Sequence, residues 1–294
     1  MPVKLIYVRS LLPLLLLLPS TVATQGQPAT PLPPALAPPQ AQALVERALA
    51  CELRTAQDPT HPMRYRLRKS SPRLTTTKEI VETRDGDVAR LVSIYDQPLT
   101  QADEQMEQAR LDALLGDPGR QRHRKQSEEE DTGIVLKLLR MLPQAFLYEY
   151  AGAGQGASGR VEKFRFRPNP GFSPPDLETQ ALTAMSGELW IDAAEERVAR
   201  LEGHLQEDTD YGWGILGKLD KGGWIVIEQA DVGGGQWRIA RFQMNISLRI
   251  LFKTKSFDTT QEMSQYAPVS AGLDYRQAIQ MLRAAPVSTS QASP

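Results

Sequence analysis

Alternating apolar and polar positions dominate the second half of the chain and predict β-strands there. Phe242 and Met244 fall on one face of such a pattern, and Arg241 and Gln243 fall on the other. A two-residue period is typical of a strand with one buried and one solvated face. The strands predicted in this half are 145–150, 161–167, 187–192, 197–206, 223–232, 236–245 and 247–257. Because short turns join them, we expect antiparallel pairing within one large sheet.

The first half mixes strand patterns with the 3.6-residue spacing of helices. Asp85 and Gly86 lie between two strand-like runs and indicate a hairpin, and Thr100 followed by Asp103 indicates a helix N-terminus. The predicted strands are 63–69, 75–83 and 88–95, and the predicted helices are 41–56, 100–115, 132–142 and 176–185. This order predicts an α+β fold, with a curved antiparallel sheet (a half-open barrel) whose concave face is covered by several helices.

A block of segregated charge lies between the second and third predicted helices. Within residues 120–131, basic side chains come first and acidic side chains follow. Such a block is typical of a solvated loop, and we expect it to tether the apolar helix 132–142. Pro143 is expected to end that helix, because proline cannot donate a helical hydrogen bond.

The N-terminus has the features of a secretory signal peptide. Lys4 and Arg9 precede a short apolar run at 11–18, and small residues at 20–23 suit cleavage after Ala23. The apolar run is shorter than the ~20 residues that span a bilayer, although an uncleaved anchor is the alternative. We therefore expect a periplasmic protein. Its expected parts are a signal peptide at 1–23, a Pro/Ala/Gln-rich linker at 24–40, a curved-sheet domain at 41–270 and a C-terminal tail at 271–294.

Composition and motifs argue against several classes of function. The 34 basic and 35 acidic residues give a net charge of −1, unlike the basic surface of a nucleic-acid binder. A single cysteine, Cys51, rules out an internal disulfide. Glycine motifs at 154–159 and 212–217 lead into strands rather than helices, so we expect no nucleotide site. Motifs typical of hydrolases or zinc proteases are absent, and we expect no catalysis, cofactor or metal.

The apolar face of the predicted sheet is the main functional evidence. The helices either fill this face permanently as a core, or cover it loosely so that an apolar ligand can displace them. In the second case, the ligand would contact side chains on the helices and on the last strands. These candidate residues are Met106, Leu111, Leu114, Leu115, Val135, Leu138, Leu139, Leu142, Phe242, Met244, Ile250 and Phe252.

The sequence also resembles a known family. The segment Gly-Glu-Leu-Trp-Ile-Asp at 187–192, followed by a strand that ends near Leu205, resembles the central hairpins of outer-membrane lipoprotein-sorting proteins. Together with the helix at 41–56 and the Asp85-Gly86 hairpin, it resembles the periplasmic LolA/LolB-type lipoprotein carriers over residues 41–269. The resemblance implies a half-open barrel with lid helices over a lipid-binding cavity. The charge block and the proline-rich loop 168–175 depart from the shorter family pattern.

These features together predict an exported protein of the bacterial cell envelope. Its expected role is non-catalytic binding or carriage of a lipid or lipoprotein acyl chain, with envelope membrane proteins as further partners and neither nucleic acid nor nucleotide as a ligand. One alternative is an envelope structural or interaction protein with a filled apolar core, and another is an unrecognised hydrolase. An apolar space under movable helices favours the carrier, a filled concavity favours the scaffold, and convergent titratable groups favour the hydrolase.

Overall fold

The computed structural model describes residues 36–211, 217–250 and 253–284. The predicted signal peptide and most of the predicted linker lie outside these residues. The described helices are α1 (Pro38–Ala56), α2 (Gln101–Gly116), α3 (Pro118–Ala145), α4 (Leu177–Gln180), the short 3-10 helix η1 (Ala181–Ala184) and α5 (Tyr275–Ala284). None of these helices is long and apolar enough to cross a membrane.

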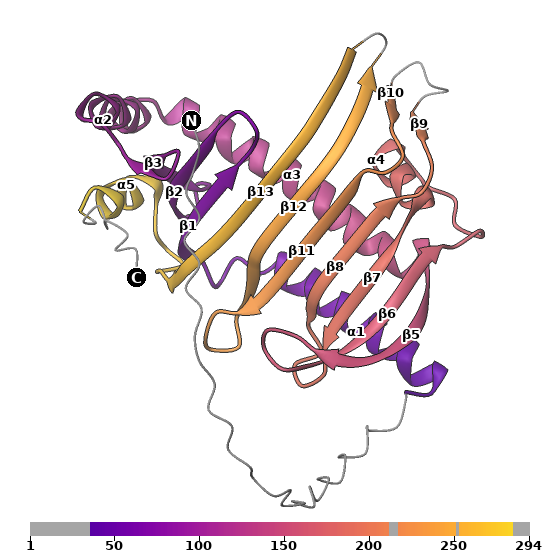
Figure 1. The fold of residues 1–294 in the computed structure, drawn as a ribbon. Coiled ribbons are helices and arrows are strands. Elements are labelled where there is room, and N and C mark those ends of the chain that lie inside the picture. The colour runs from indigo at the N-terminus through magenta and orange to yellow at the C-terminus, as the bar shows by residue number, and fades with distance from the viewer. Residues whose placement is uncertain (1–35, 212–216, 251–252, 285–294) are drawn as a thin grey trace, which may run out of the picture. The chain divides into compact units, whose positions relative to one another are not determined.

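Within the described residues, thirteen strands form one antiparallel sheet that does not close (Figure 1). The strands are β1 (Met63–Ser70), β2 (Thr75–Val81), β3 (Val88–Ile94), β4 (Gln97–Pro98), β5 (Phe146–Gln155), β6 (Arg160–Pro168), β7 (Met185–Asp192), β8 (Val198–Leu205), β9 (Thr209–Tyr211), β10 (Gly217–Leu219), β11 (Trp224–Asp231), β12 (Trp237–Ile250) and β13 (Lys253–Pro268). Their order across the sheet is β4-β3-β2-β1-β13-β12-β11-β8-β7-β6-β5, with β10 beside β12 and β9 beside β10. The α+β class and the open antiparallel sheet are confirmed.

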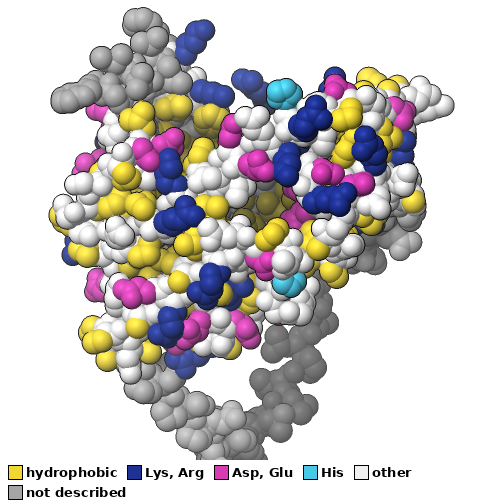
Figure 2. All heavy atoms as spheres, turned by 180° about the vertical axis from the view of Figure 1, so that it is seen from behind, with side chains coloured by type: hydrophobic (Ala, Val, Ile, Leu, Met, Phe, Trp, Pro, Cys, Tyr) yellow, Lys and Arg dark blue, Asp and Glu magenta, His cyan; other side chains and the backbone are white. Residues whose placement is uncertain are grey.

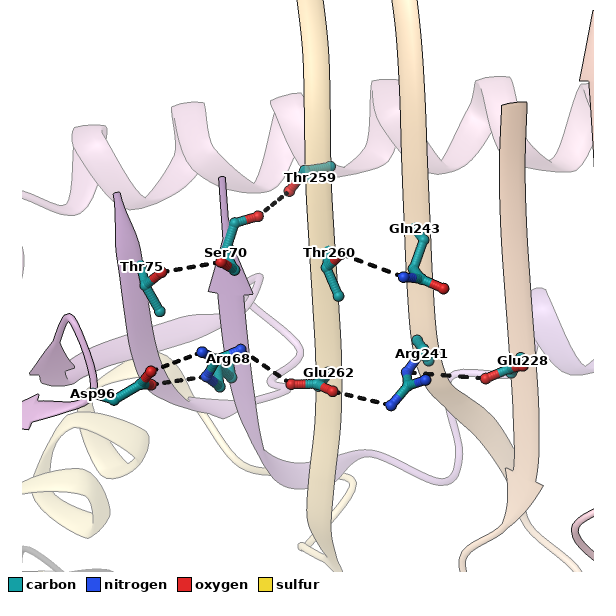
Figure 3. A network of polar contacts seen from close by, with 10 residues as sticks. All are labelled: Arg68, Ser70, Thr75, Asp96, Glu228, Arg241, Gln243, Thr259, Thr260 and Glu262. Carbon is teal, nitrogen blue, oxygen red and sulfur yellow. Dashed lines mark hydrogen bonds and ion pairs between the residues drawn. The ribbon is translucent and has the colours of Figure 1, made fainter. Parts of the chain in front are cut away.

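The two faces of the sheet differ in polarity. Helices α1 and α3 cross one face, which we call the inner face (Figure 1). The opposite, outer face carries a ladder of ion pairs across neighbouring strands: Arg68 bonds to Asp96 at 2.7 Å and to Glu262 at 3.2 Å, and Arg241 bonds to Glu262 at 3.1 Å (Figure 3). Glu228 continues the ladder onto β11. Because these charges are paired with one another in solvent, the outer face is the wet face of the sheet.

A first core cluster fills the inner face at the β5–β8 end. Val45 and Ala48 of α1 and Leu189 and Ile191 of β7 are completely buried there. The C-terminal turns of α3 close the same cluster with Leu142 and Ala145. Each fully buried aliphatic side chain stabilises the fold by roughly 1.5–3 kcal/mol, so this end is firmly packed.

A second core cluster lies at the β2–β3 end. Val81 and Val88 of the sheet pack with α2 and with α5, which contributes Ala278 and Ile279. The sequence analysis included α5 in the C-terminal tail and did not predict it as a helix. Its apolar residues nevertheless follow helical spacing: they are Tyr275, Ala278, Ile279 and Leu282.

The charge block at 120–131 is helical, so the expectation of a solvated loop is wrong. Asp117 caps α3 by accepting the N–H of Arg120 at 3.0 Å, and Pro118 occupies the first turn, where its missing N–H costs nothing. The segregated charges pair one helical turn apart, as Arg124–Glu128 and Lys125–Glu129 do at 3.7 Å. The short helix predicted at 132–142 is therefore the second half of a 28-residue helix.

Two other boundaries also differ from the prediction. Pro143 lies inside α3, which continues to the buried Ala145 rather than ending at residue 142. The boundary predicted between the strands 236–245 and 247–257 is wrong. β12 continues without a turn to Ile250, and β13 begins at Lys253. The apolar positions Phe242 to Leu248 therefore follow one another along a single strand, whereas the sequence analysis divided them between two.

The N-terminal helix starts earlier than predicted. Residues 38–40 belong to α1, although the sequence analysis included them in an extended linker. Pro38 suits the first helical turn because its ring fixes a helical φ and no N–H is needed there. The side chain of Gln40 accepts the N–H of Ala37 at 3.3 Å, which caps the helix start.

Candidate functional site

A row of directly paired residues crosses the inner face. Phe164 pairs with Leu189, Leu189 with Leu201, Leu201 with Ile227, and Ile227 with Phe242. Directly opposite residues in an antiparallel sheet point to the same face, so all five side chains point toward the helices. Phe164 and Leu189 are buried in the first core cluster, whereas Ile227 and Phe242 are only half-buried.

The half-buried residues continue along β11 and β12. Ile225 pairs with Met244, and Ile246 is two residues further on the same face of β12. These side chains are partly accessible, and none belongs to the first or second core cluster. We call this set the central floor: Ile225, Ile227, Phe242, Met244 and Ile246. Hydrophobic side chains are visible in a hollow near the middle of the helix-bearing side (Figure 2).

The middle of α3 has no buried face. All seven residues from 129 to 135 are exposed, including Ile134 at 40% and Val135 at 52%. Seven residues make about two helical turns, and a helix lying on a sheet would bury at least one residue in each turn. We call residues 129–135 the span. The elements in closest contact with α3 are α1, α4, η1, β5 and α2.

The two ends of α3 are held by different chemistry. At its C-terminal end, Leu142 and Ala145 are buried in the first core cluster, and the hydroxyl of Tyr148 donates to the carbonyl of Leu142 at 3.1 Å. At its N-terminal end, polar side chains bind the backbone of the turn at residues 84–87. The span therefore bridges an apolar anchor and a polar anchor.

The other helix on the inner face is fixed by a buried ion pair. Glu52 of α1 accepts from the guanidinium of Arg197 at 2.8 and 3.0 Å and from the N–H of Val198 at 3.0 Å. Burial opposes the charge of Arg197, but the hydrogen bonds to Glu52 and its negative charge outweigh burial and raise the pKa of Arg197. A buried pair that is fully hydrogen-bonded is costly to break, so α1 is a fixed cover.

Titratable groups gather beside the central floor where β1 and β13 meet the start of α3. The rings of Tyr65 and Tyr266 stack with centroids 5.1 Å apart. Burial is the main cause that raises the pKa of each phenol, and nearby carboxylates act in the same direction. The pKa of Glu82 is also raised, mainly by burial. This side of the floor is therefore polar but poorly solvated.

A separate open cleft of about 520 Å³ lies at the C-terminal end of α3. Its walls combine Met141 and Gln144 of α3 with the loop after β6. The loop residues are Asn169, Gly171, Phe172, Ser173 and Pro175. Asn169 holds this loop to the helix end by donating from its side chain to the carbonyl of Gln144 at 2.9 Å.

The structure divides the twelve predicted contact residues into separate groups. Phe242 and Met244 lie in the central floor, and Val135 lies in the span. Three others, Leu138, Leu139 and Leu142, belong to the first core cluster or pack against it. The α2 residues do not lie over the floor: Leu111, Leu114 and Leu115 pack in or against the second core cluster, and Met106 is exposed.

Two further predicted residues, Ile250 and Phe252, lie wholly or partly outside the described part. Ile250 is the last residue of β12 and its side chain is outside the described part, as is the whole of Phe252. Sequence reasoning missed Ile225 and Ile227 as floor residues. The predicted strand at 223–232 was the available signal, because residues 225 and 227 are two apart and share a strand face, although the apolar Val226 between them hides the alternation.

The polar clusters in the described residues do not assemble an evident catalytic group. Asp58, Thr60 and His61 form the nearest approach to a nucleophile–base–acid chain, with contacts of 2.6 to 2.9 Å. However, Nδ1 of His61 contacts both the hydroxyl and the carboxylate, whereas a proton relay uses the two ring nitrogens separately. The cluster is also exposed on a loop. Among the described residues, no group of three histidine, cysteine or acidic side chains is placed to hold a metal ion.

Comparison with known proteins gives one structural resemblance. No protein-family model matches the sequence, and no curated protein matches it. The fold is similar to the crystal structure of a domain assigned to outer membrane lipoprotein sorting from Vibrio parahaemolyticus, with 10% sequence identity and a TM-score of 0.29. The alignment covers 81% of this chain and 99% of that domain.

Proposed function

We propose that the protein is an exported, non-catalytic carrier that binds the acyl chain of a lipid or lipoprotein between the central floor and the span. The observation that carries this proposal is the half-burial of five apolar floor residues on the face that α3 crosses, where the middle of α3 buries no side chain. An acyl chain gains about 0.8 kcal/mol for each methylene that it removes from water. The central floor supplies the apolar surface against which the acyl chain would be buried.

The position of the floor between two anchored ends supports this proposal. The first and second core clusters stabilise the fold independently of the floor. The span can therefore move without exposing either core, which a carrier requires when its ligand enters and leaves. The Ile134 and Val135 side chains are exposed on the span and would gain burial against a bound chain.

The scaffold alternative has its own supporting observation. Leu138, Leu139 and Leu142 of α3 pack into the first core cluster, which is filled as an interaction protein requires. Envelope membrane proteins would then be the partners, and apolar ligands would find no room. The two functions differ in one measurable property, which is saturable binding of a single acyl chain.

A binding titration with cis-parinaric acid, a fluorescent fatty acid, tests the proposal. We expect saturable binding at one site, and we expect Met244→Glu to weaken it at least about tenfold by placing a charge in the apolar floor. Asn245→Glu is the matched control, because this neighbouring residue is exposed and points to the outer face. Equal effects of the two variants, or no saturable binding by the native chain, would reject the carrier.

The native ligand and the export step need separate measurements. Native mass spectrometry of protein purified from its own cell envelope should show an added mass that corresponds to one lipid or acyl group. N-terminal sequencing of that protein should begin at or near Thr24, as expected for signal-peptide cleavage. An intact N-terminus in the membrane fraction would instead indicate that the protein is anchored to the membrane.

A further inference from the structure

The polar anchor of α3 consists mainly of bonds to one turn of backbone. Gln121 donates to the carbonyl of Asp85 at 2.8 Å, and Arg124 donates to the carbonyl of Asp87 at 3.0 Å. In the reverse direction, the N–H of Asp87 donates to Oε2 of Glu128 at 2.8 Å. These bonds hold the helix to the β2–β3 turn, and none of them uses the side chain of Asp87.

Close packing at this anchor depends on Gly86. Its φ of +93° lies in the left-handed region that favours glycine. A Cβ at this position would come within 2.8 Å of the carboxylate of Glu128 and 3.1 Å of the backbone of Lys125. The helix therefore rests directly on the turn, and the half-buried Asp87 lies beside Glu128, whose carboxylate accepts the N–H of Asp87.

Two carboxylates lie close to Asp87: Glu128 accepts its N–H, and Glu82 is its neighbour across the hairpin, since Val81 pairs with Val88. Glu82 lies at the end of β2, where its carboxylate accepts the N–H of Met63 at 2.8 Å. Arg124 is the cation that acts on Asp87, and its guanidinium is already bonded to the carbonyl of that residue. The titratable and charged groups of the surrounding elements are Arg124, Lys125 and Glu128 of α3, Glu82 after β2, Tyr65 of β1, Tyr266 of β13, and Arg84 and Asp85 of the turn itself.

We propose that this junction is a pH-sensitive latch, which holds α3 against the β2–β3 turn when Asp87 is protonated and releases the helix when Asp87 ionises. Ionisation places a third carboxylate beside Glu128 and Glu82 in a poorly solvated space. Release of α3 removes the cover and separates Glu128 from Asp87, so the charged form is favoured in the released state. The hydrogen bonds from Gln121 and Arg124 to the turn backbone determine where α3 lies. The charge of the Asp87 side chain determines how stable this attachment is.

The direction of the pH dependence follows from proton linkage. Burial, followed by the charges of Glu128 and Glu82, raises the pKa of Asp87 from its ordinary value of 3.8 to about 7. The attached state therefore keeps a proton that the released, solvated state loses between these two pH values. Attachment is strongest below this window and weakens as pH rises through it, because the released state binds fewer protons.

The latch can open the central floor because it holds one end of the span. The other end of α3 is fixed by apolar packing that does not titrate. Release at the β2–β3 turn would therefore let the span bend away from the floor, while α2 stays in the second core cluster and the C-terminal turns of α3 stay in the first. This consequence rests on the proposed function, whereas the latch itself does not.

Pulsed electron double resonance between two nitroxides tests the latch directly. The labels are placed at Gln126→Cys on α3 and Thr254→Cys on β13, both exposed, in a Cys51→Ser background of the full chain. We expect one dominant distance at about pH 5 and a longer-distance population at least about fivefold larger at about pH 8. Asp87→Asn should remove this dependence while keeping both backbone bonds, and Glu128→Gln should shift its midpoint to lower pH.

Asp131→Asn removes an exposed carboxylate from the same helix and should keep the native pH dependence. Distances that do not change with pH in the native chain, or a native response in Asp87→Asn, would overturn the latch. If the distances change as expected but cis-parinaric acid does not bind at either pH, the latch stands and the carrier function fails.

Discussion

The inner face of the sheet presents the same kind of side chain near its β5–β8 end and in its middle, under different cover. At the β6–β7 end, Phe164 and Leu189 are at most 1% exposed and touch α1 or the last turns of α3. Further along the same paired row, Ile227 and Phe242 remain half-buried, and neither joins a core cluster. The difference lies in what covers each region, since the strands carry equally apolar residues in both.

One sheet can therefore combine a stable packed region with an apolar region that stays accessible. Covers at the closed end are fixed by the Glu52–Arg197 pair and by apolar packing. The helix that crosses the central floor is α3, and its span belongs to neither the first nor the second core cluster. Stability and ligand access are therefore assigned to separate regions, so that a change in one should leave the other largely intact.

The largest expected contrast is between two phenylalanines of the same row. Phe164→Ala should cost about 3–5 kcal/mol, because it empties a fully packed site. Phe242→Ala should cost less, about 1–2 kcal/mol, because part of the Phe242 side chain is still exposed in the open floor. Equilibrium urea unfolding followed by circular dichroism measures both. Equal costs would mean that the floor is ordinary core.

The fixed cover can be tested through its buried ion pair. Glu52→Ala should cost about 3–5 kcal/mol, because it leaves Arg197 buried without its charge partner. Arg47→Ala on the same helix removes the exposed pair with Glu196 and should change stability little. Thermal unfolding of the two variants measures this difference. A small effect of Glu52→Ala would show that α1 is not held more tightly than the span.

Two glycines test the anchor and the span with smaller effects. Gly86→Ala should destabilise the chain by about 1–2 kcal/mol, because of its positive φ and the short approach to Glu128. Gly133→Ala lies in the span, where an added Cβ meets nothing within 4 Å. This change should stabilise the helix by about 0.5–1 kcal/mol. A destabilising Gly133→Ala, measured by the same unfolding assay, would indicate that the span is packed after all.

Much of the fold could be predicted from local patterns. Strand alternation, the Asp85-Gly86 turn and the Thr100–Asp103 capping box depend on neighbouring residues, and the structure shows each of them. The length of α3 was underestimated because segregated charge was interpreted as a loop, although charges one turn apart also stabilise a helix. The turn between β12 and β13 was misplaced because no glycine or proline marks it.

The alternation of apolar and polar residues was not enough to predict the candidate site. A period of two tells which face a side chain is on, and it correctly grouped Phe242 with Met244. It cannot tell whether a helix lies over that face, because cover is set by contacts between distant segments, such as Glu52 with Arg197. For the same reason, Leu111 and Leu114 were assigned to a ligand site, whereas α5 covers them.

Photolabelling with a diazirine-bearing fatty acid tests the open floor most directly. After irradiation and digestion, mass spectrometry locates the residues that carry the adduct. The account predicts adducts on β11 and β12, at Ile225 to Ile227 and Phe242 to Ile246, and on the span at Ile134 or Val135. Adducts confined to the cleft around Phe172, or labelling that excess unlabelled fatty acid does not reduce, would contradict it.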